Sequence, residues 1–240
     1  MKVKYFDLKN KRVFVSGGGS GIGATIVEHF CEQQSEVYFI DINIKASKQL
    51  IEKIKKKRFR VPKFIECNVL EIQKLQNLIK DIISKKGPIH CLINSAANDD
   101  RHSTEQVDEK YWENRMGINL KHYFFAAQSV VKGMKKIKSG SIVNLSSVSW
   151  VLGEGDKVIY ETAKSAVIGL TRSFAQEFGK FNIRTNSVIP GSIATERQIK
   201  NWLTPKYKKL ILDSQALKRQ LKPEDVARLV LFLSSDQSSG

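Results

Sequence analysis

The stretch "RVFVSGGGSGIG", residues 12–23, runs a short apolar segment directly into a glycine-rich turn, and a helix-like segment follows. Glycines at a strand-to-helix turn let the backbone turn tightly and approach a pyrophosphate, whose charge is met by amides at the helix N-terminus. Surface turns also use glycine, so the rest of the chain has to support this interpretation. The stretch predicts the first unit of a nucleotide-binding α/β fold.

The pattern of apolar residues alternates between strand and helix along the whole chain. Helix-like stretches fill the gaps between short β-branched runs, which predict strands at 12–16, 36–41, 62–67, 90–94, 141–146 and 183–189. Regular alternation favours a parallel sheet with helices on both faces and ligands outside the carboxyl ends of the strands. We therefore expect a single Rossmann-type, doubly wound α/β domain over residues 1–240, because no stretch of linker composition divides the chain.

The bulk composition favours a cytoplasmic protein. The N-terminal residues do not resemble a signal peptide, and no apolar run approaches the roughly 20 residues of a membrane span. Cys31, Cys67 and Cys91 are widely spaced among apolar neighbours, which favours reduced core thiols over disulfides or a metal site. We expect no bound metal.

The formal net charge of +16 is the one unusual bulk property, and it raises the possibility of nucleic-acid binding. The lysines are scattered, however, and the densest run, "KIKKKRFR" at 53–60, resembles the exposed end of a helix. No recognition helix, zinc spacing or aromatic ribonucleoprotein motif accompanies it. We interpret the charge as a solvated, lysine-rich surface.

An acidic residue at the end of the second predicted strand bears on the choice of nucleotide. Asp41 ends that strand, and a carboxylate there can accept hydrogen bonds from both ribose hydroxyls of NAD. The same charge would repel the extra phosphate of NADP. The alternative is that Asp41 is an ordinary strand-end residue. We expect NAD.

From its first strand almost to its last residue, the chain resembles the short-chain dehydrogenase/reductase family, with the family's motifs in order. "SGGGSGIG" resembles T-G-x-x-x-G-I-G, with Ser16 in place of threonine, and "NSAA" at 94–97 resembles N-N-A-G, with Ser95 and Ala97 as departures. Asn68 stands where an aspartate usually meets the adenine. The resemblance implies nucleotide contacts from Gly17, Ser20, Gly21, Ile22, Gly23, Asp41, Asn68, Val69, Asn94, Ala96, Tyr160, Lys164, Pro190, Gly191, Ile193 and Thr195.

The segment "YETAK", residues 160–164, matches the family's Y-x-x-x-K. Residues four apart share one helix face, so the Tyr160 hydroxyl and the Lys164 ammonium can point into one cleft. A nearby lysine cation and a positive nicotinamide ring both favour the phenolate. Lowering the pKa by about three units needs roughly 4 kcal/mol of differential stabilisation. We expect Tyr160 to act as a general base with a lowered pKa.

Three further motifs complete the resemblance. Ser147 is expected to hold the reacting oxygen, and Asn119 is expected to hold a water near Lys164. Taken singly, a serine at a strand end or an asparagine in a helix is more often structural. "PGSIAT" at 190–195 resembles P-G-x-x-x-T and is expected to bend over the nicotinamide; a plain turn is the alternative.

Two regions, 98–130 and 146–156 with 195–205, resemble bacterial NAD-dependent aldose 1-dehydrogenases, which implies oxidation of an anomeric hydroxyl to a lactone. The resemblance suggests substrate contacts, in a site covered by a lid at about 192–218. Trp202 is expected either to anchor that lid or to touch substrate, and His29, Cys31 and His122 are expected to be structural. The candidate sugar-binding side chains are Asn98, Asp99, Arg101, His102, Trp150 and Gln198.

Two alternatives stand beside the sugar dehydrogenase. One is an enzyme of the same family acting on another alcohol or ketone, such as an oxoacyl reductase, although Asp41 argues against its usual NADP. The other is a silent, nucleotide-binding member, because the family normally continues through a last strand and this sequence stops at Gly240. In the family that strand also helps to build a tetramer, so we expect a homo-tetramer where it is present.

Overall fold

The computed structural model describes residues 3–239. Its strands are β1 (Arg12–Ser16), β2 (Glu36–Asp41), β3 (Lys63–Glu66), β4 (Cys91–Asn94), β5 (Gly140–Leu145) and β6 (Ile183–Val188). All six pair in parallel in the order β3-β2-β1-β4-β5-β6. The expected doubly wound sheet is confirmed, and each strand lies within one residue of its predicted bounds. The strand order reverses between β1 and β4, which is where sheets of this topology bind ligands.

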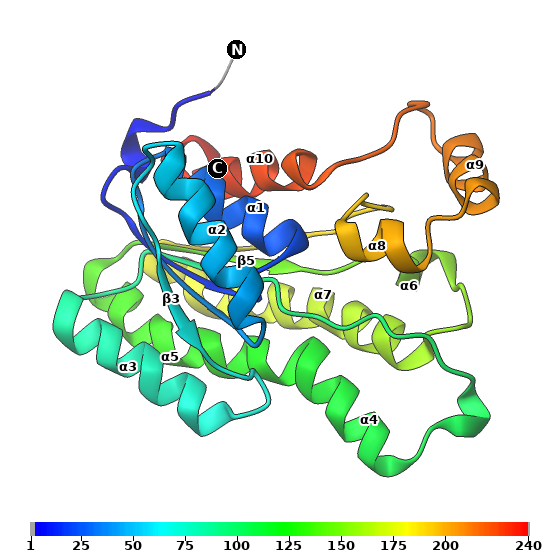
Figure 1. The fold of residues 1–240 in the computed structure, drawn as a ribbon. Helices are drawn as coiled ribbons and strands as arrows, with labels where there is room; N and C mark the ends of the chain where they lie inside the picture. Colours follow the sequence, from blue (N-terminus) through cyan, green and yellow to red (C-terminus); the bar gives the residue numbers. More distant parts are fainter. Residues whose placement is uncertain (1–2, 240) are drawn as a thin grey trace.

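Helices cover both faces of the sheet (Figure 1). One layer contains α1 (Gly21–Glu32), α2 (Ile44–Lys56) and α10 (Pro223–Ser234), and the other contains α3 (Ile72–Lys86), α5 (His122–Ile137) and α7 (Val158–Phe178). Shorter elements near the carboxyl edge are α4 (Glu109–Met116), the π-helical turn η3 (Gly117–Lys121), α6 (Ser149–Leu152), α8 (Glu196–Asn201) and α9 (Pro205–Ser214). The 3-10 turns are η1 (Phe6–Leu8), η2 (Thr104–Gln106), η4 (Gly179–Phe181) and η5 (Asp236–Ser238).

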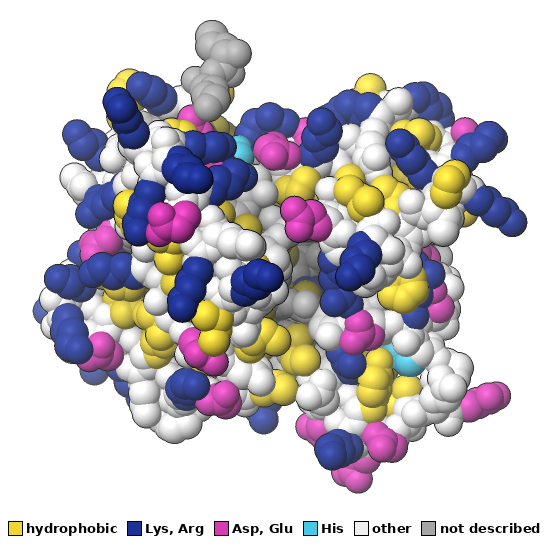
Figure 2. Space-filling view, in the orientation of Figure 1, with side chains coloured by type: hydrophobic (Ala, Val, Ile, Leu, Met, Phe, Trp, Pro, Cys, Tyr) yellow, Lys and Arg dark blue, Asp and Glu magenta, His cyan; other side chains and the backbone are white. Residues whose placement is uncertain are grey.

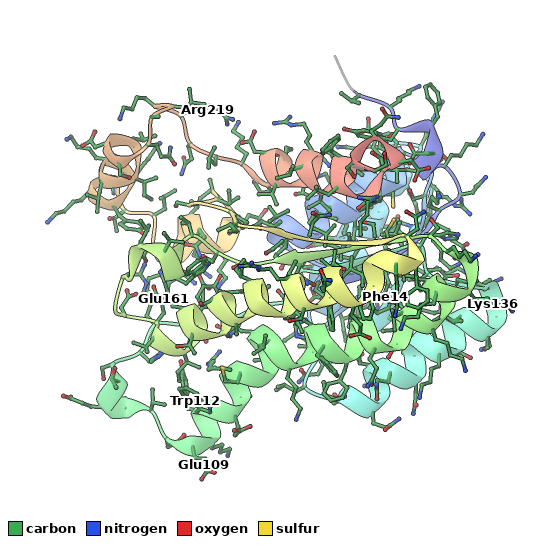
Figure 3. The ribbon with its side chains drawn as sticks, turned by 180° about the vertical axis from the view of Figure 1, so that it is seen from behind. Phe14, Glu109, Trp112, Lys136, Glu161 and Arg219 are labelled. Carbon is green, nitrogen blue, oxygen red and sulfur yellow. The ribbon has the colours of Figure 1, made fainter. Side chains whose placement is uncertain are left out.

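The core is divided in two by the sheet, because successive residues of a strand point to opposite faces. Val13 and Val15 pack with α1, α2 and α10, whereas Phe14, between them, packs with α3, α5 and α7. Figure 3 shows Phe14 in the interior of the molecule, far from Trp112 on the outer helix α4. The side chains of Val13, Phe14 and Val15 are fully buried, which fixes the strand that leads into the glycine-rich turn.

The segment between β6 and α10 leaves the body of the molecule and returns to it. Ile193 and Leu221 form a parallel β-bridge at its base, and the Ala194 amide donates to the Leu221 carbonyl at 2.9 Å. Between these points, α8 lies over the carboxyl edge of the sheet and α9 projects outward (Figure 1). This excursion contains most of the predicted lid at 192–218.

The surface carries the expected charge in a dispersed form. Lysine and arginine side chains are spread over the whole face shown in Figure 2, with acidic side chains among them, and a hollow lies near its middle. Cys31, Cys67 and Cys91 are buried free thiols, as expected. Among residues 3–239, no helix combines the length and the apolar composition needed to cross a bilayer.

Arg184 on β6 connects this edge strand to the end of α10. Its guanidinium donates to the carbonyls of Leu233 at 2.5 Å and Ser235 at 3.0 Å, and to the Ser238 hydroxyl at 2.6 Å. The carbonyls at the end of a helix have no partner within the helix, so an arginine there satisfies groups that would otherwise be left unpaired.

We expect Arg184→Ala to lower the free energy of unfolding by about 2–4 kcal/mol, because it removes several hydrogen bonds from a charged group. Urea denaturation measures the change. The matched control is Arg172→Ala, since Arg172 is exposed on α7. Equal stability of the two variants would contradict the role given to Arg184.

Candidate active site

The glycine-rich turn after β1 has the shape of an anion cradle. Gly17 has φ +68° and Gly21 has φ +54°, a region that favours glycine. A Cβ on Gly23 would lie 1.9 Å from the Gly17 carbonyl oxygen, so α1 can approach the turn only because position 23 lacks a side chain. The Ser20 side chain is exposed and does not cap α1, so it leaves the first amides of that helix without a side-chain acceptor. Ile22, in the first turn of α1, is half-buried. These features fit a dinucleotide pyrophosphate.

Asp41 is fixed at the end of β2 by backbone amides. Its carboxylate accepts hydrogen bonds from the Gly19 amide and the Asn43 amide, each at 2.8 Å. A Cβ on Gly19 would lie 2.8 Å from the Asp41 carboxyl carbon, so glycine is required for this approach. The carboxylate is therefore held beside the glycine-rich turn, as the position of a ribose-binding group requires.

Ser16 joins the glycine-rich turn to the loop after β4 and to α5. Its hydroxyl oxygen accepts from the amides of Ser95 at 3.1 Å and Ala96 at 3.3 Å, and lies 3.3 Å from His122 Nε2. Burial lowers the pKa of His122 to about 3, so the ring is neutral. Because the Ser16 oxygen already accepts from two amides, its own proton is left to donate to His122 Nε2. These contacts hold Ala96 against Gly17. A Cβ on Gly17 would lie only 2.6 Å from the Ala96 Cα atom.

The Asn94 side chain lies in the interior of the protein. It is fully buried, and its amide donates to Asn144 Oδ1 at 2.9 Å, while Asn144 donates to Thr171 at 3.0 Å. In the structure the Asn94 side chain connects β4 to β5 inside the sheet, and its expected nucleotide contact stays a prediction.

The expected adenine-side residues lie in the turn after β3. Asn68 is half-buried, and its Oδ1 accepts from the Leu70 amide at 3.0 Å, which stabilises that turn and leaves its Nδ2 as the free donor. Val69 is 8% exposed and packs into the core against α3. Of these two, only Asn68 presents a polar side chain for recognition of a base.

The "PGSIAT" turn lies over the glycine-rich turn. The Pro190 carbonyl accepts from the Val148 amide at 3.0 Å, Gly191 lies near Leu221, and Ile193 is 6% exposed at the base of the excursion. Thr195 caps α8, because its hydroxyl accepts from the Gln198 amide at 3.2 Å. A Cβ on Gly21 would lie 3.4 Å from the Thr195 methyl group, so the two turns face each other.

Ser147, Tyr160 and Lys164 come together beside these turns. The Ser147 hydroxyl follows β5 and lies 2.9 Å from the Ser149 hydroxyl. Lys164 Nζ lies 5.6 Å from the centre of the Tyr160 ring. The spacing expected from "YETAK" therefore puts both side chains on one face of α7, next to the serine.

Burial dominates the electrostatics of Tyr160 and Lys164. Burial raises the pKa of Tyr160, the Ser147 hydroxyl lowers it, and the Asp99 charge raises it, with a net shift upward. Burial lowers the pKa of Lys164 to about 7, and Asp99 raises it. In the chain by itself the pKa of Tyr160 is raised, because desolvation outweighs the lowering by the Ser147 hydroxyl; the lowered pKa expected beside Lys164 and a nicotinamide stays a prediction.

Asn119 contacts a loop rather than Lys164. It lies fully buried in the π-helical turn η3, where its Oδ1 accepts from the Asn98 amide at 2.8 Å and its Nδ2 donates to the Asn98 carbonyl at 3.0 Å. Both polar atoms of its side chain are thereby used. Asn98 in turn accepts from the Asp100 amide at 2.8 Å. Asn119 therefore fixes the backbone of the loop that forms one wall of the site.

The excursion is fastened to that loop by polar contacts. Gln198 Nε2 donates to Asp99 Oδ2 at 2.6 Å, and Arg197 pairs with Asp99 at 3.3 Å and with Asp100 at 2.5 Å. Arg115 also pairs with Asp100, at 3.1 Å. Asp99 is the charge that acts on both Tyr160 and Lys164, so α8 contacts the wall that faces this pair.

Two of the expected sugar-binding residues have partners within the protein. Arg101 stacks on Trp202, 4.4 Å from the ring centre, and pairs with Asp156 at 2.9 Å. His102 contacts the Tyr111 hydroxyl at 3.2 Å. Trp202 thus anchors the excursion. Trp150 on α6 is half-buried, and its Nε1 has no hydrogen-bond partner among the described residues.

Sequence reasoning missed the contacts of His122 and Tyr123. Lys164 Nζ donates to the Tyr123 hydroxyl and to the Leu145 carbonyl, each at 2.8 Å. The signal in the sequence was the spacing, because His122 and Tyr123 lie three and four residues after Asn119. His29 bonds within its own helix, to the Thr25 carbonyl at 2.8 Å.

Comparisons with known proteins agree with this arrangement. A family model described as "Enoyl-(Acyl carrier protein) reductase" matches residues 17–240. The chain is 42% identical to a D-xylose 1-dehydrogenase of Caulobacter vibrioides over 235 residues, 98% of this chain and 92% of the relative. It is 40% identical over 233 residues, 97% of this chain and 91% of the relative, to a protein of Rhizobium meliloti named "Probable galactose dehydrogenase GalD".

The fold also matches a solved structure, that of a 3-oxoacyl-[acyl-carrier protein] reductase from Brucella melitensis. The TM-score is 0.89 at 25% identity, covering 100% of this chain and 92% of that one. Fold, site and relatives together define an oxidoreductase that acts on CH–OH groups with a nicotinamide cofactor. The chain belongs to the short-chain dehydrogenase/reductase family.

Burial of Lys164 has a measurable cost in stability. Its pKa of about 7 lies below the ordinary 10.5, so between these values the unfolded chain binds more protons than the folded chain. The penalty is therefore full below about pH 7 and fades as the pH rises toward 10.5.

We expect Lys164→Met to raise the free energy of unfolding by about 1–2 kcal/mol at neutral pH, because it removes a desolvated charge. The gain should shrink as the pH rises. Denaturant titration at several pH values measures it, with Lys180→Met, on the partly exposed turn after α7, as the control. A gain that is independent of pH would contradict the assignment of the penalty to the Lys164 charge.

Proposed function

We propose that this protein oxidises the anomeric C1 hydroxyl of an aldose, such as a pentose, to a lactone with NAD. The C1–H bond breaks and its hydrogen is transferred with both electrons as a hydride to the oxidised nicotinamide, the hydroxyl proton passes to the enzyme, and the O–H electron pair forms the lactone carbonyl. A bound nicotinamide cofactor supplies the hydride acceptor. The observation that carries the proposal is the juxtaposition of Ser147, Tyr160 and Lys164 with the glycine-rich turn at one sheet edge.

In this proposal Tyr160 removes the hydroxyl proton and Ser147 orients the oxygen. The Ser147 hydroxyl lowers the pKa of Tyr160, so the same contact that orients the substrate favours ionisation of the base. In the chain alone the pKa of Tyr160 is raised, and the additional stabilisation of the phenolate must come from the positive charge of the nicotinamide. In this arrangement the Lys164 ammonium is the charged partner of the Tyr160 phenolate.

Support for NAD comes from Asp41. Its carboxylate is aimed by two amides at the place where the ribose would bind, and a fixed negative charge disfavours a 2′-phosphate. The residues that would hold the cofactor are those of the glycine-rich turn, Asp41, Asn68 and the turn at 190–195. Support for an aldose comes from Asp99, whose carboxylate faces the catalytic pair and can accept hydroxyl hydrogen bonds.

The alternative within the family is reduction of an oxoacyl group. It is favoured by the similarity to the Brucella melitensis reductase, which is more distant at 25% identity than the sugar dehydrogenases at 40–42%. Asp99, with its partners Gln198 and Arg197, makes the wall beside the catalytic pair polar, which suits sugar hydroxyls better than an apolar acyl chain. We therefore prefer the aldose.

We expect purified protein to reduce NAD with a pentose such as D-xylose or L-arabinose, and not with the 1,5-anhydro sugar, which keeps the ring but lacks the anomeric hydroxyl. Absorbance of NADH measures the rate, and hydroxylamine traps the lactone as a hydroxamate. Tyr160→Phe should lower kcat by at least about a thousandfold, since it removes the hydroxyl that acts as the general base. Turnover of a 3-oxoacyl substrate with NADPH, and none with aldoses, would replace the proposal with the alternative.

We expect Asp41→Asn to weaken discrimination against NADP by about tenfold or more, because about 1.4 kcal/mol of repulsion corresponds to a factor of ten. Fluorescence titration with NADH and NADPH measures the two dissociation constants without turnover. Asp81→Asn, which removes the same charge from the exposed face of α3, is the control. An unchanged ratio would show that Asp41 serves only to fix the turn.

A further inference from the structure

Lys164 is held from behind by a second tyrosine. Tyr123 on α5 is fully buried, and its hydroxyl accepts from Lys164 Nζ at 2.8 Å while donating to the Leu145 carbonyl at 3.0 Å. The same carbonyl accepts from Lys164 Nζ at 2.8 Å. Three polar groups therefore form a closed triangle at the end of β5, beneath the catalytic pair.

The hydroxyl of Tyr123 has a defined polarity in this triangle. Burial raises the pKa of Tyr123 far above its ordinary value, so the group stays protonated. Because its one proton goes to the Leu145 carbonyl, its oxygen is free to accept from the ammonium. An acceptor pair of phenol and carbonyl is suited to a protonated lysine, since an ammonium has three donors and no acceptor.

The triangle also sets the direction of the third N–H of Lys164. Two donors are used by Tyr123 and Leu145, and the third has no partner among residues 3–239. The nitrogen lies 4.9 Å from the Tyr123 ring centre and 5.6 Å from the Tyr160 ring centre. Tetrahedral geometry keeps the remaining donor apart from the two that point to Tyr123 and Leu145, so it is available to another acceptor.

No other side chain in the described chain takes this place. Asn119 uses both polar atoms of its side chain on the Asn98 backbone, so it cannot also support the lysine directly. The remaining charged or titratable groups near Lys164 are Tyr160 on α7, Asp99 in the loop after β4 and the neutral His122 on α5. Of the side chains that the structure describes near Lys164, Tyr123 alone accepts a hydrogen bond from the ammonium.

We propose that Tyr123 is a positioning residue that keeps Lys164 protonated and aimed at the site through the Tyr123–Leu145–Lys164 triangle. This role rests on the proposed function only in that Lys164 is taken as the charged partner of Tyr160. It adds a group that the short-chain dehydrogenase motifs of this sequence do not contain. The residue itself touches neither substrate nor cofactor, because it has no exposed surface.

The test removes only the hydroxyl of Tyr123. In Tyr123→Phe the protonation midpoint of Lys164 should fall by about one pH unit, the effect of losing a hydrogen bond to a charged group. The pH at which kcat declines on the alkaline side should move down by the same amount. Near pH 8 kcat should therefore be about tenfold lower, with less than about a twofold change in the substrate KM.

Carbon-13 labelling of the lysine Cε atoms gives a readout that needs no substrate. The Lys164 resonance is assigned by its loss in Lys164→Met and is then followed through a pH titration. If no sugar is oxidised by the wild-type protein, the function proposed above fails, and the titration still decides the role of Tyr123. A lowered midpoint in Tyr123→Phe supports that role whatever the substrate.

The matched control is Tyr38→Phe. Tyr38 on β2 is also a buried tyrosine whose hydroxyl donates a hydrogen bond, to Glu36 at 2.6 Å, at a distance from the site. It should lose comparable stability with no change in the Lys164 midpoint. Tyr123→3-fluorotyrosine, which keeps the ring and weakens the acceptor, should give a smaller shift in the same direction even if Tyr123→Phe does not fold. An unmoved midpoint in both Tyr123 variants would overturn the proposal.

Discussion

All six strands of the sheet are parallel, so their carboxyl ends meet at one edge, and the rest of the site depends on that constraint. The glycine-rich turn follows β1, Asp41 ends β2, the loop with Asp99 follows β4, and Ser147 follows β5. None of these segments is adjacent in sequence. A parallel ladder brings them together because each strand returns through a helix to the same starting edge.

At that edge the chain tolerates groups that cost stability. Lys164 is buried with a pKa near 7, and Tyr160 is desolvated far enough that its pKa rises. These costs are accepted because the surrounding backbone is rigidly tied: Ser16 binds two amides of the next loop, and Asn119 clamps the Asn98 backbone. Strained or desolvated groups persist in proteins where neighbouring contacts fix them, and they are common where chemistry is done.

Most of the fold could be predicted from the sequence, because the spacing of apolar residues and the turn-forming residues between elements are local signals. The bounds of β1 and β2 match the predicted ones, since both strands are apolar runs closed by a turn or an acidic residue. Partners across the fold could not be predicted in this way. Asn94 matched a nucleotide-binding motif and proved to be a fully buried connection to Asn144, and Arg101, expected near a sugar, stacks on Trp202. Both depend on which distant residue happens to face them.

The sequence by itself determined the class of the protein: a doubly wound nucleotide-binding sheet, with a glycine-rich turn after its first strand and with Tyr160 and Lys164 on one face of a helix. It could do so because helix spacing and the steric demands of glycine are properties of short segments. Only the tertiary structure decided how the lysine is held and what its burial does to its charge. That outcome depends on Tyr123 and Leu145, which come from other elements, and on desolvation, which is a property of the whole packed core.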